Sequence, residues 1–510
     1  MSQLFDHPIS RLAMLVNQAW DARDSEALRA LIGEADTLYA ASMPPLAKAS
    51  IAFSRANAHS VLRLLENEKA PQLNWAWDNA DLMQEVYWLR KALADASEEP
   101  EDKRGGDLKP RILTNLANVM SHIGRFCEAI DYWDQAIATH PNFAMALANR
   151  GDGLKWYARA VYDGGHQTLF LWQSRLALAA GLSAGLEAHA VNHARDAIAY
   201  LDTLGDWETF TYDLDKYPLG DTDAEQRYRK WCLQNRLFLN PLNDLGPYNI
   251  GARDVMTFPS IALPIDKSGP LVPEVYGIYN QLVQEFVSAR YVAYEALQER
   301  DRATHHFSDQ GVLLYDTLDY RVLRLWVEKL KMSYLSAFAM FDKMAYLLNH
   351  YLELDIPTHR VNFGSLWFNA CKPEKGVRAE LEASENWPLR GLFNLSRDLH
   401  WSADETFAME PEAKTLHEIR RHIAHKYLTV HDSFHSAVVT VGRDRVQTGQ
   451  LAMSIGGEEL AVATVKLLKL VRNAMIYMSL AANWYEQTTR KRSDDVYAPM
   501  PLHPLGDDRI

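Results

Sequence analysis

Residues 110–143, PRILTNLANVMSHIGRFCEAIDYWDQAIATHPNF, contain two amphipathic helical patterns separated by a glycine. Apolar residues recur at helical spacing in both halves, at Leu113, Leu116, Ala117, Ala129, Trp133 and Ala136. Gly124 separates the halves and Pro141 ends the second, since glycine and proline interrupt helices. The stretch therefore predicts a helix–turn–helix unit, which sets the fold of the N-terminal part.

This unit resembles a tetratricopeptide repeat, whose 34-residue helix–turn–helix pattern it matches. A second unit is expected to begin at residues 144–158, AMALANRGDGLKWYA, with Gly151 at the position of a small residue. One such repeat cannot bury its own apolar face, so neighbours are needed on both sides. Helical patterns across residues 10–93 supply them, and we expect a helical repeat array over residues 1–201.

The rest of the chain also predicts helices. Residues 202–275 lack helical periodicity but contain scattered large apolar residues, which predicts an ordered irregular connector. Long helical patterns resume afterwards, at residues 275–297, 318–354, 387–400, 413–430 and 458–487. The chain is therefore expected to be all-α, with a C-terminal helical domain over residues 276–492 and a flexible tail over residues 493–510.

Composition limits the class of protein. The chain has 510 residues, of which 48% are hydrophobic, so it can bury a substantial core. It has three widely separated cysteines, which excludes a disulfide framework or a cysteine-based zinc site and fits a reducing compartment. The N-terminal sequence lacks the unbroken apolar run of a signal peptide, and a cytoplasmic location is expected.

Charge is distributed unevenly. The formal net charge of −13 argues against general coating of nucleic acid. Residues 411–492, however, hold 12 Lys and Arg against 7 Asp and Glu, a net charge of +5. Phosphate binding is therefore expected only in the C-terminal part.

The candidate site lies at residues 416–428, LHEIRRHIAHKYL. An ideal helix places one stripe of residues against a core: Leu416, Ile419, Ile423 and Tyr427. Arg420 is a permanent cation that matches phosphate, and His425 can carry protons near neutral pH. With the hydroxyl of Tyr427, these groups indicate RNA chemistry without a metal.

These residues resemble the motif of the HEPN superfamily, which comprises small α-helical domains, many of them RNases. Its hallmark is Arg, four to six residues, then His, and its toxin branch shows Arg-x4-His-x-Tyr, as Arg420, His425 and Tyr427 do. The resemblance covers residues 228–490, since YRKWCLQNRLFLNPLNDL, LRGLFNLSRDLH and EIRRHIAHKYLTV resemble a subgroup with N-terminal repeats. The chain departs from the pattern at Arg421, where many members have a small polar residue.

The resemblance implies a metal-independent endoribonuclease that needs no cofactor and acts as a toxin or antiviral effector. His425 would remove the proton of a ribose 2′-OH, and Arg420 would stabilise the charge that develops at phosphorus. The superfamily commonly dimerises, so a homodimer through the HEPN-like domain is expected. The repeats would bind a protein partner, and a nucleotidyltransferase antitoxin that modifies Tyr427 would be a further partner.

Helical geometry complicates the site. Residues five apart lie about 140° apart on a regular helix, so Arg420 and His425 diverge, whereas Arg421 shares a face with His425. We therefore expect one histidine with two candidate arginines, completed across a dimer. His422 and Tyr427 would support the site, and Asp398 would orient the arginine or the histidine.

Three alternatives remain at this stage. Arg300 and His305 repeat the spacing, but Phe307 replaces the tyrosine there. A non-catalytic repeat adaptor, whose HEPN-like domain only binds RNA or dimerises, is the main rival. A metal-dependent hydrolase is the third, because His431 and His435 lie one helical turn apart.

Overall fold

The computed structural model describes residues 8–98, 106–264, 274–302, 305–317, 319–399, 409–431, 452–489 and 497–499. Helices dominate these residues, which confirms the all-α prediction. The chain divides into two compact units, and each draws on two stretches of sequence. The first consists of residues 1–213 and 373–413, and the second of residues 214–372 and 414–510.

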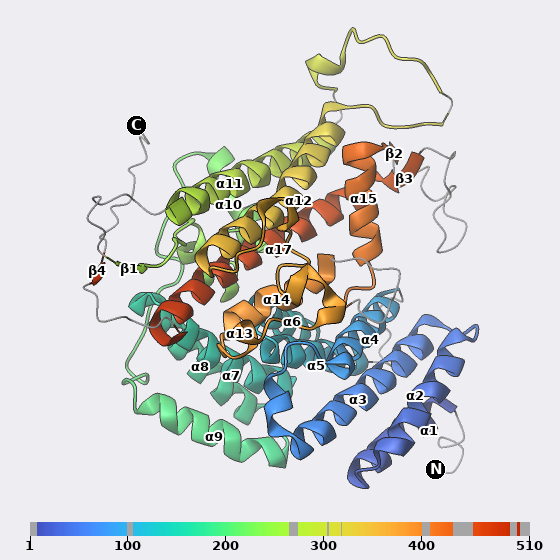
Figure 1. Cartoon of the computed structure of the whole chain (residues 1–510), viewed down its shortest axis with the longest axis vertical. Coiled ribbons are helices and arrows are strands. Elements are labelled where there is room, and N and C mark those ends of the chain that lie inside the picture. Colours follow the sequence, from blue (N-terminus) through green and yellow to red (C-terminus); the bar gives the residue numbers. More distant parts are fainter. Residues whose placement is uncertain are drawn as a thin grey trace. The chain divides into compact units, whose positions relative to one another are not determined.

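The first unit is a series of helices, each of which packs against the next along the chain (Figure 1). They are α1 (Pro8–Asp21), α2 (Ser25–Ala40), α3 (Pro45–Lys69), α4 (Ala80–Ser97), α5 (Leu108–His122), α6 (Phe126–Thr139), α7 (Ala144–Ala160), α8 (Gly164–Ser183) and α9 (Ala188–Asp202). The most extensive pairings join α3 to α4, α5 to α6 and α7 to α8. This packing in pairs confirms the prediction of a helical repeat array.

Helices α5 and α6 are the helix–turn–helix unit that the sequence predicts. Its six apolar positions are all buried, at Leu113, Leu116, Ala117, Ala129, Trp133 and Ala136. Gly124 has a φ of +85°, a left-handed conformation that favours glycine. A Cβ at Gly151 of α7 would lie 2.7 Å from Cγ of Leu178 on α8. The small residue therefore allows α7 and α8 to approach closely.

Residues 373–413 pack in the first unit, although the sequence boundaries placed them in the C-terminal domain. They include α13 (Ala379–Glu382) and α14 (Trp387–Leu399), and residues 388–398 of α14 are all buried. Trp387 donates from Nε1 to the carbonyl oxygen of Ser121 at 2.9 Å. A Cβ at Gly391 would fall 2.2 Å from the carbonyl oxygen of Gly124. A helix buried on all faces needs neighbours on all sides, and the repeat helices provide them.

The second unit is a bundle in which α11, α12 and α17 pack against one another. Its helices are α10 (Asp223–Gln234), α11 (Glu274–Arg300), α12 (Leu325–Tyr351), α15 (Ala413–His425) and α17 (Gly457–Trp484). Helices α11 and α17 lie where the periodicity predicts them. Helix α12 begins at Leu325 rather than at residue 318, and α15 ends at His425 rather than at residue 430.

The irregular residues 214–264 are ordered within the second unit and supply partners for two buried arginines. Arg472 of α17 is fully buried and donates from Nη1 to Asp244 at 2.6 Å. Arg290 of α11 donates from Nη1 and Nη2 to the two carboxylate oxygens of Asp254, each at 2.8 Å. A buried guanidinium is tolerated only when it is paired and hydrogen-bonded, so these contacts hold the irregular segment on the bundle.

The second unit also contains short strands, which the sequence did not predict. Strand β2 (Tyr427–His431) pairs in parallel with β3 (Ala452–Gly456), and β1 (Ala262–Pro264) pairs antiparallel with β4 (Tyr497–Pro499). Val322 adds to the first pair, since its N–H donates to the carbonyl oxygen of Val430 at 2.7 Å. The prediction that one helix carries Tyr427 is therefore wrong, because the chain enters β2 there.

In the part of the chain that the structure describes, no helix has both the length and the apolar character of a membrane span.

Candidate active site on α15

Helix α15 packs through the apolar face that the sequence predicts. Leu416 and Ile419 are buried, and the hydroxyl of Tyr334 on α12 donates to the carbonyl oxygen of Leu416 at 2.8 Å. The fourth member of the predicted stripe, Tyr427, does not belong to it, because it starts β2 and its ring is 40% exposed. The anchored face leaves the C-terminal turn of α15 open to solvent.

Arg420 lies over α12. Its guanidinium carbon is 4.6 Å from the centre of the Phe338 ring, and its Nη2 is 3.9 Å from Oδ2 of Asp342. The Arg420 side chain remains 37% exposed. The ring and the carboxylate orient the guanidinium while part of it stays accessible to a phosphate.

His425 is the last residue of α15 and is exposed. Among the described residues, no hydrogen bond or ion pair joins it to Arg420, Arg421 or Tyr427. The ring of Tyr427 instead packs beneath Arg321, whose guanidinium carbon is 5.1 Å from the ring centre. The end of α15 therefore presents an open imidazole beside an accessible tyrosine.

Arg421 and His422 both bond to Glu418. Nη2 of Arg421 donates to the Glu418 carboxylate at 2.6 Å, and the buried His422 donates from Nδ1 to the Glu418 carbonyl oxygen at 2.8 Å. The carboxylate of Glu418 therefore balances the positive charge of Arg421. The nearby His417 has a lowered pKa because of its burial and then the positive charge of Arg420.

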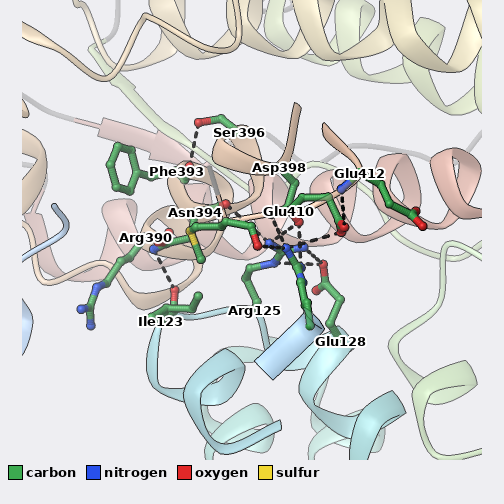
Figure 2. A network of polar contacts seen from close by, with 12 residues as sticks. Ile123, Arg125, Glu128, Arg390, Phe393, Asn394, Ser396, Asp398, Glu410 and Glu412 are labelled. Atoms are coloured by element: carbon green, nitrogen blue, oxygen red, sulfur yellow. Dashed lines mark hydrogen bonds and ion pairs between the residues drawn. The ribbon is translucent and has the colours of Figure 1, made fainter. Parts of the chain in front are cut away.

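Asp398, the expected orienting residue, lies on α14 in the first unit. Its carboxylate accepts two hydrogen bonds from Arg90, at 2.7 and 2.9 Å, and is 2.5 Å from Nη1 of Arg125. Figure 2 shows this carboxylate beside Arg125, Glu128 and Glu410. Burial raises the pKa of Asp398, but the charges of Arg125 and Arg90 outweigh it and lower the pKa below its usual value. Within the first unit, this carboxylate is therefore paired with Arg90 and Arg125.

The second Arg-x4-His copy has different neighbours. Arg300 pairs with Glu458 and Asp301, and Nε2 of His305 is 3.4 Å from Nη2 of Arg324. His305 also lines a cavity of about 280 Å³ near the N-terminal end of α12. His305 is exposed, as His425 is, but its arginine neighbour is Arg324 and the expected tyrosine is replaced by Phe307.

Within the described residues, no group of three or more His, Cys, Asp or Glu side chains is placed to hold a metal ion. His431 is buried at the end of β2, and neither of its ring nitrogens has a hydrogen-bond partner among the residues that the structure describes. The hypothesis of a metal site also involves His435, which lies outside the described residues.

Three neighbours of the motif were missed at the level of sequence: Phe338, Asp342 and Arg321. Asp342 had a visible signal, since it is an isolated acid in the apolar stretch SAFAMFDKMAYLL of α12. Phe338 lies four residues earlier, on the same face of the helix. Nothing in the sequence indicated Arg321. Its neighbour Val322 is hydrogen-bonded to Val430 of β2, and this pairing brings Arg321 close to Tyr427.

The fold and the motif together define an all-α protein in which a helical repeat array accompanies a small helical domain with an Arg–His–Tyr motif. Residues 267–485 match the family model LA2681-like HEPN. The chain therefore contains a domain of the HEPN superfamily, which confirms the resemblance. No curated protein and no solved structure matches the chain significantly.

Proposed function

We propose that the protein is a metal-independent endoribonuclease whose site is formed by Arg420 and His425. The observation that supports this most directly is the open C-terminal end of α15, where His425 is exposed and Arg420 is oriented by Phe338 and Asp342. Membership of a superfamily that includes many RNases is consistent with the proposal.

The chemistry follows from the two side chains. Neutral His425 accepts the proton of a ribose 2′-OH, and the 2′-oxygen attacks the adjacent phosphorus. The bond to the 5′-oxygen breaks, and that oxygen takes a proton to leave as a 5′-OH beside a 2′,3′-cyclic phosphate. Proton transfer of this kind contributes on the order of 10²–10⁴-fold. Arg420 stabilises the charge on the phosphoryl oxygens. DNA is not cleaved, because it lacks the 2′-OH.

The two residues diverge on α15, so a second copy completes the site. Arg421 shares a face with His425, but its bond to Glu418 weakens it as a phosphate ligand. We therefore assign the principal phosphate contact to Arg420 and a supporting contact to Arg421. His422 supports the site by fixing the backbone of α15.

The biological role that fits this chemistry is a toxin or defence effector whose repeats bind a partner or sense a trigger. The accessible ring of Tyr427 suits modification of its hydroxyl by a nucleotidyltransferase antitoxin. Such a modification would add bulk and negative charge next to His425.

The test is cleavage of RNA in the presence of EDTA, followed by analysis of the product ends. We expect cyclic phosphate ends from the wild type and loss of cleavage in Arg420→Ala and His425→Ala. Exposed residues of the same types supply matched controls, Arg195→Ala and His189→Ala on α9, which should cleave normally. Equal cleavage by the wild type and His425→Ala would refute the assignment, and loss of activity in EDTA would indicate a metal.

A non-catalytic RNA-binding adaptor is the second candidate. It is favoured by the lack of any bond between Arg420 and His425 among the described residues and by the pairing of Arg421 with Glu418. RNA binding by the wild type without cleavage, under conditions in which it dimerises, would establish the adaptor instead.

A further inference from the structure

The loop between α11 and α12 exposes a run of apolar side chains. Residues 311–317, GVLLYDT, which we call the arm, have no helix or strand. Leu313 is 98% exposed and Tyr315 is 95% exposed, whereas Val312 and Leu314 are 56% and 57% exposed. Figure 1 shows this loop extending away from α11 and α12.

The apolar side chains of the arm form a contiguous exposed patch. Exposure alternates along the arm, as it would in an extended segment whose side chains point to opposite sides, and Leu313 and Tyr315 are the more exposed pair. Burial of these side chains would stabilise the protein, because apolar surface is removed from water. Contiguous exposed apolar patches commonly mark interaction sites.

The same unit carries a groove that suits these side chains. A cavity of about 490 Å³ lies between α11, α12 and the turn at Thr358, with apolar walls from Ile278, Ala339, Tyr346 and Val361. One water-sized group occupies about 30 Å³, so the groove has room for the Leu313 and Tyr315 side chains together. Ala339 is exposed and the Tyr346 ring is 46% exposed, so the groove is open.

We propose that the arm of one copy docks in this groove of a second copy, and that the exchange is reciprocal. The inference rests on the dimer of the proposed function and specifies its interface. An exposed apolar arm and an open apolar groove on one unit are self-complementary, which is the property of a twofold interface.

Area also favours a second copy over a different protein. The side chains of Leu313 and Tyr315 bury roughly 350 Å² on one arm. A single arm is therefore small beside the roughly 1,200–2,000 Å² that stable interfaces bury. Two arms in two grooves, counted on both partners, reach that range.

The groove borders the candidate active site. Asp342 lines it and is also the carboxylate that faces Arg420 at 3.9 Å. An arm seated there removes water from one side of this pair, which strengthens the pair and holds the guanidinium more firmly. Docking of the second copy thus fixes the position of the Arg420 guanidinium next to the groove.

Sedimentation equilibrium of the full chain tests the inference with three variants. The arm variant is Leu313→Asp with Tyr315→Asp, the groove variant is Ala339→Arg, and the matched control is Leu204→Asp, at an exposed leucine of the first unit. All these positions are exposed, so circular dichroism should show folded protein in each.

We expect the arm and groove variants each to raise the dimer dissociation constant by at least 100-fold, about 2.8 kcal/mol, and the control to leave it unchanged. A mixture of the arm and groove variants should recover association in part, because one intact arm still meets one intact groove. A wild-type monomer, or dimers unaffected by both variants, would overturn the inference.

RNA cleavage is measured separately on the same samples. A wild type that cleaves RNA, with variants that dimerise normally, refutes the docking and leaves the nuclease proposal standing. Arm-dependent dimers without cleavage refute the nuclease and support the docking.

Discussion

Replacing Asp398 by asparagine tests the buried charge network of the first unit. Asp398 is 1% exposed and accepts two hydrogen bonds from Arg90 while it faces Arg125 at 2.5 Å. The new amide would be neutral and would turn its NH₂ group towards a guanidinium. Two buried cations would then lack their shared counter-charge.

The magnitude follows from these contacts. Breaking a buried ion pair by removing one partner costs about 3–5 kcal/mol. Such a loss is large beside the roughly 5–15 kcal/mol by which domains are stable. With a urea m-value of about 3 kcal/mol/M, the midpoint of unfolding should fall by at least 1 M.

The assay is urea unfolding followed by circular dichroism, combined with hydrogen exchange of peptides from α14. Exchange in residues 387–399 should accelerate, because this helix is held by the network. The matched control is Asp196→Asn, an exposed aspartate of α9, which should change stability by less than about 0.5 kcal/mol. A loss below about 1 kcal/mol for Asp398→Asn would refute the reasoning.

The same carboxylate predicts a dependence on pH. The pKa of Asp398 is lowered in the folded state, because Arg125 and Arg90 outweigh the effect of burial. Its stabilising contribution is therefore complete above the unfolded-state pKa of about 3.9 and declines as the pH falls towards the folded-state pKa. Unfolding followed from about pH 5 to about pH 2 should show a steeper decline in the wild type than in Asp398→Asn, which lacks the contribution of this carboxylate.

Three further predictions concern buried or partly buried groups. Asp244→Ala should destabilise the second unit by about 3–5 kcal/mol, since it leaves Arg472 fully buried without its carboxylate, and urea unfolding measures this. Gly124→Ala should destabilise the first unit by more than about 1 kcal/mol in the same assay, because the new Cβ would lie 2.1 Å from the carbonyl oxygen of Trp387 at a φ of +85°. Burial and neighbouring arginines lower the pKa of His122 to about 3, so NMR titration should find it neutral at about pH 5. The unfolded chain binds this proton below about pH 6.5, and stability should therefore fall from about pH 6.5 towards about pH 3.

Each of these predictions has a control. Asp206→Asn and Gly164→Ala change an exposed aspartate and a glycine with open space around its Cβ position, and should be nearly neutral. His122→Gln should lack the part of the pH dependence that this imidazole causes, since glutamine does not titrate. Normal stability of Asp244→Ala or Gly124→Ala, or protonation of His122 above about pH 5, would contradict the corresponding packing argument.

Periodicity predicted the helices well, because a helix forms bonds between residues four apart. The repeat at residues 110–143 has its expected apolar residues buried and its turn at Gly124. The same local rule places Arg420 and His425 on α15. The spacing cannot show that α15 ends at His425, because β2 pairs with β3 more than twenty residues later.

The sequence by itself determined the all-α class, the pairing of repeat helices and the motif that identifies the HEPN superfamily. The tertiary structure decided that α14 packs with the repeats, that Asp398 pairs with Arg90 and Arg125, and that Arg420 faces Asp342. The physical reason is the separation in sequence over which each interaction acts. Helical hydrogen bonds and amphipathic faces are local, whereas a buried charge is satisfied by whichever opposite charge the fold brings to it, here across 308 residues for Arg90 and Asp398.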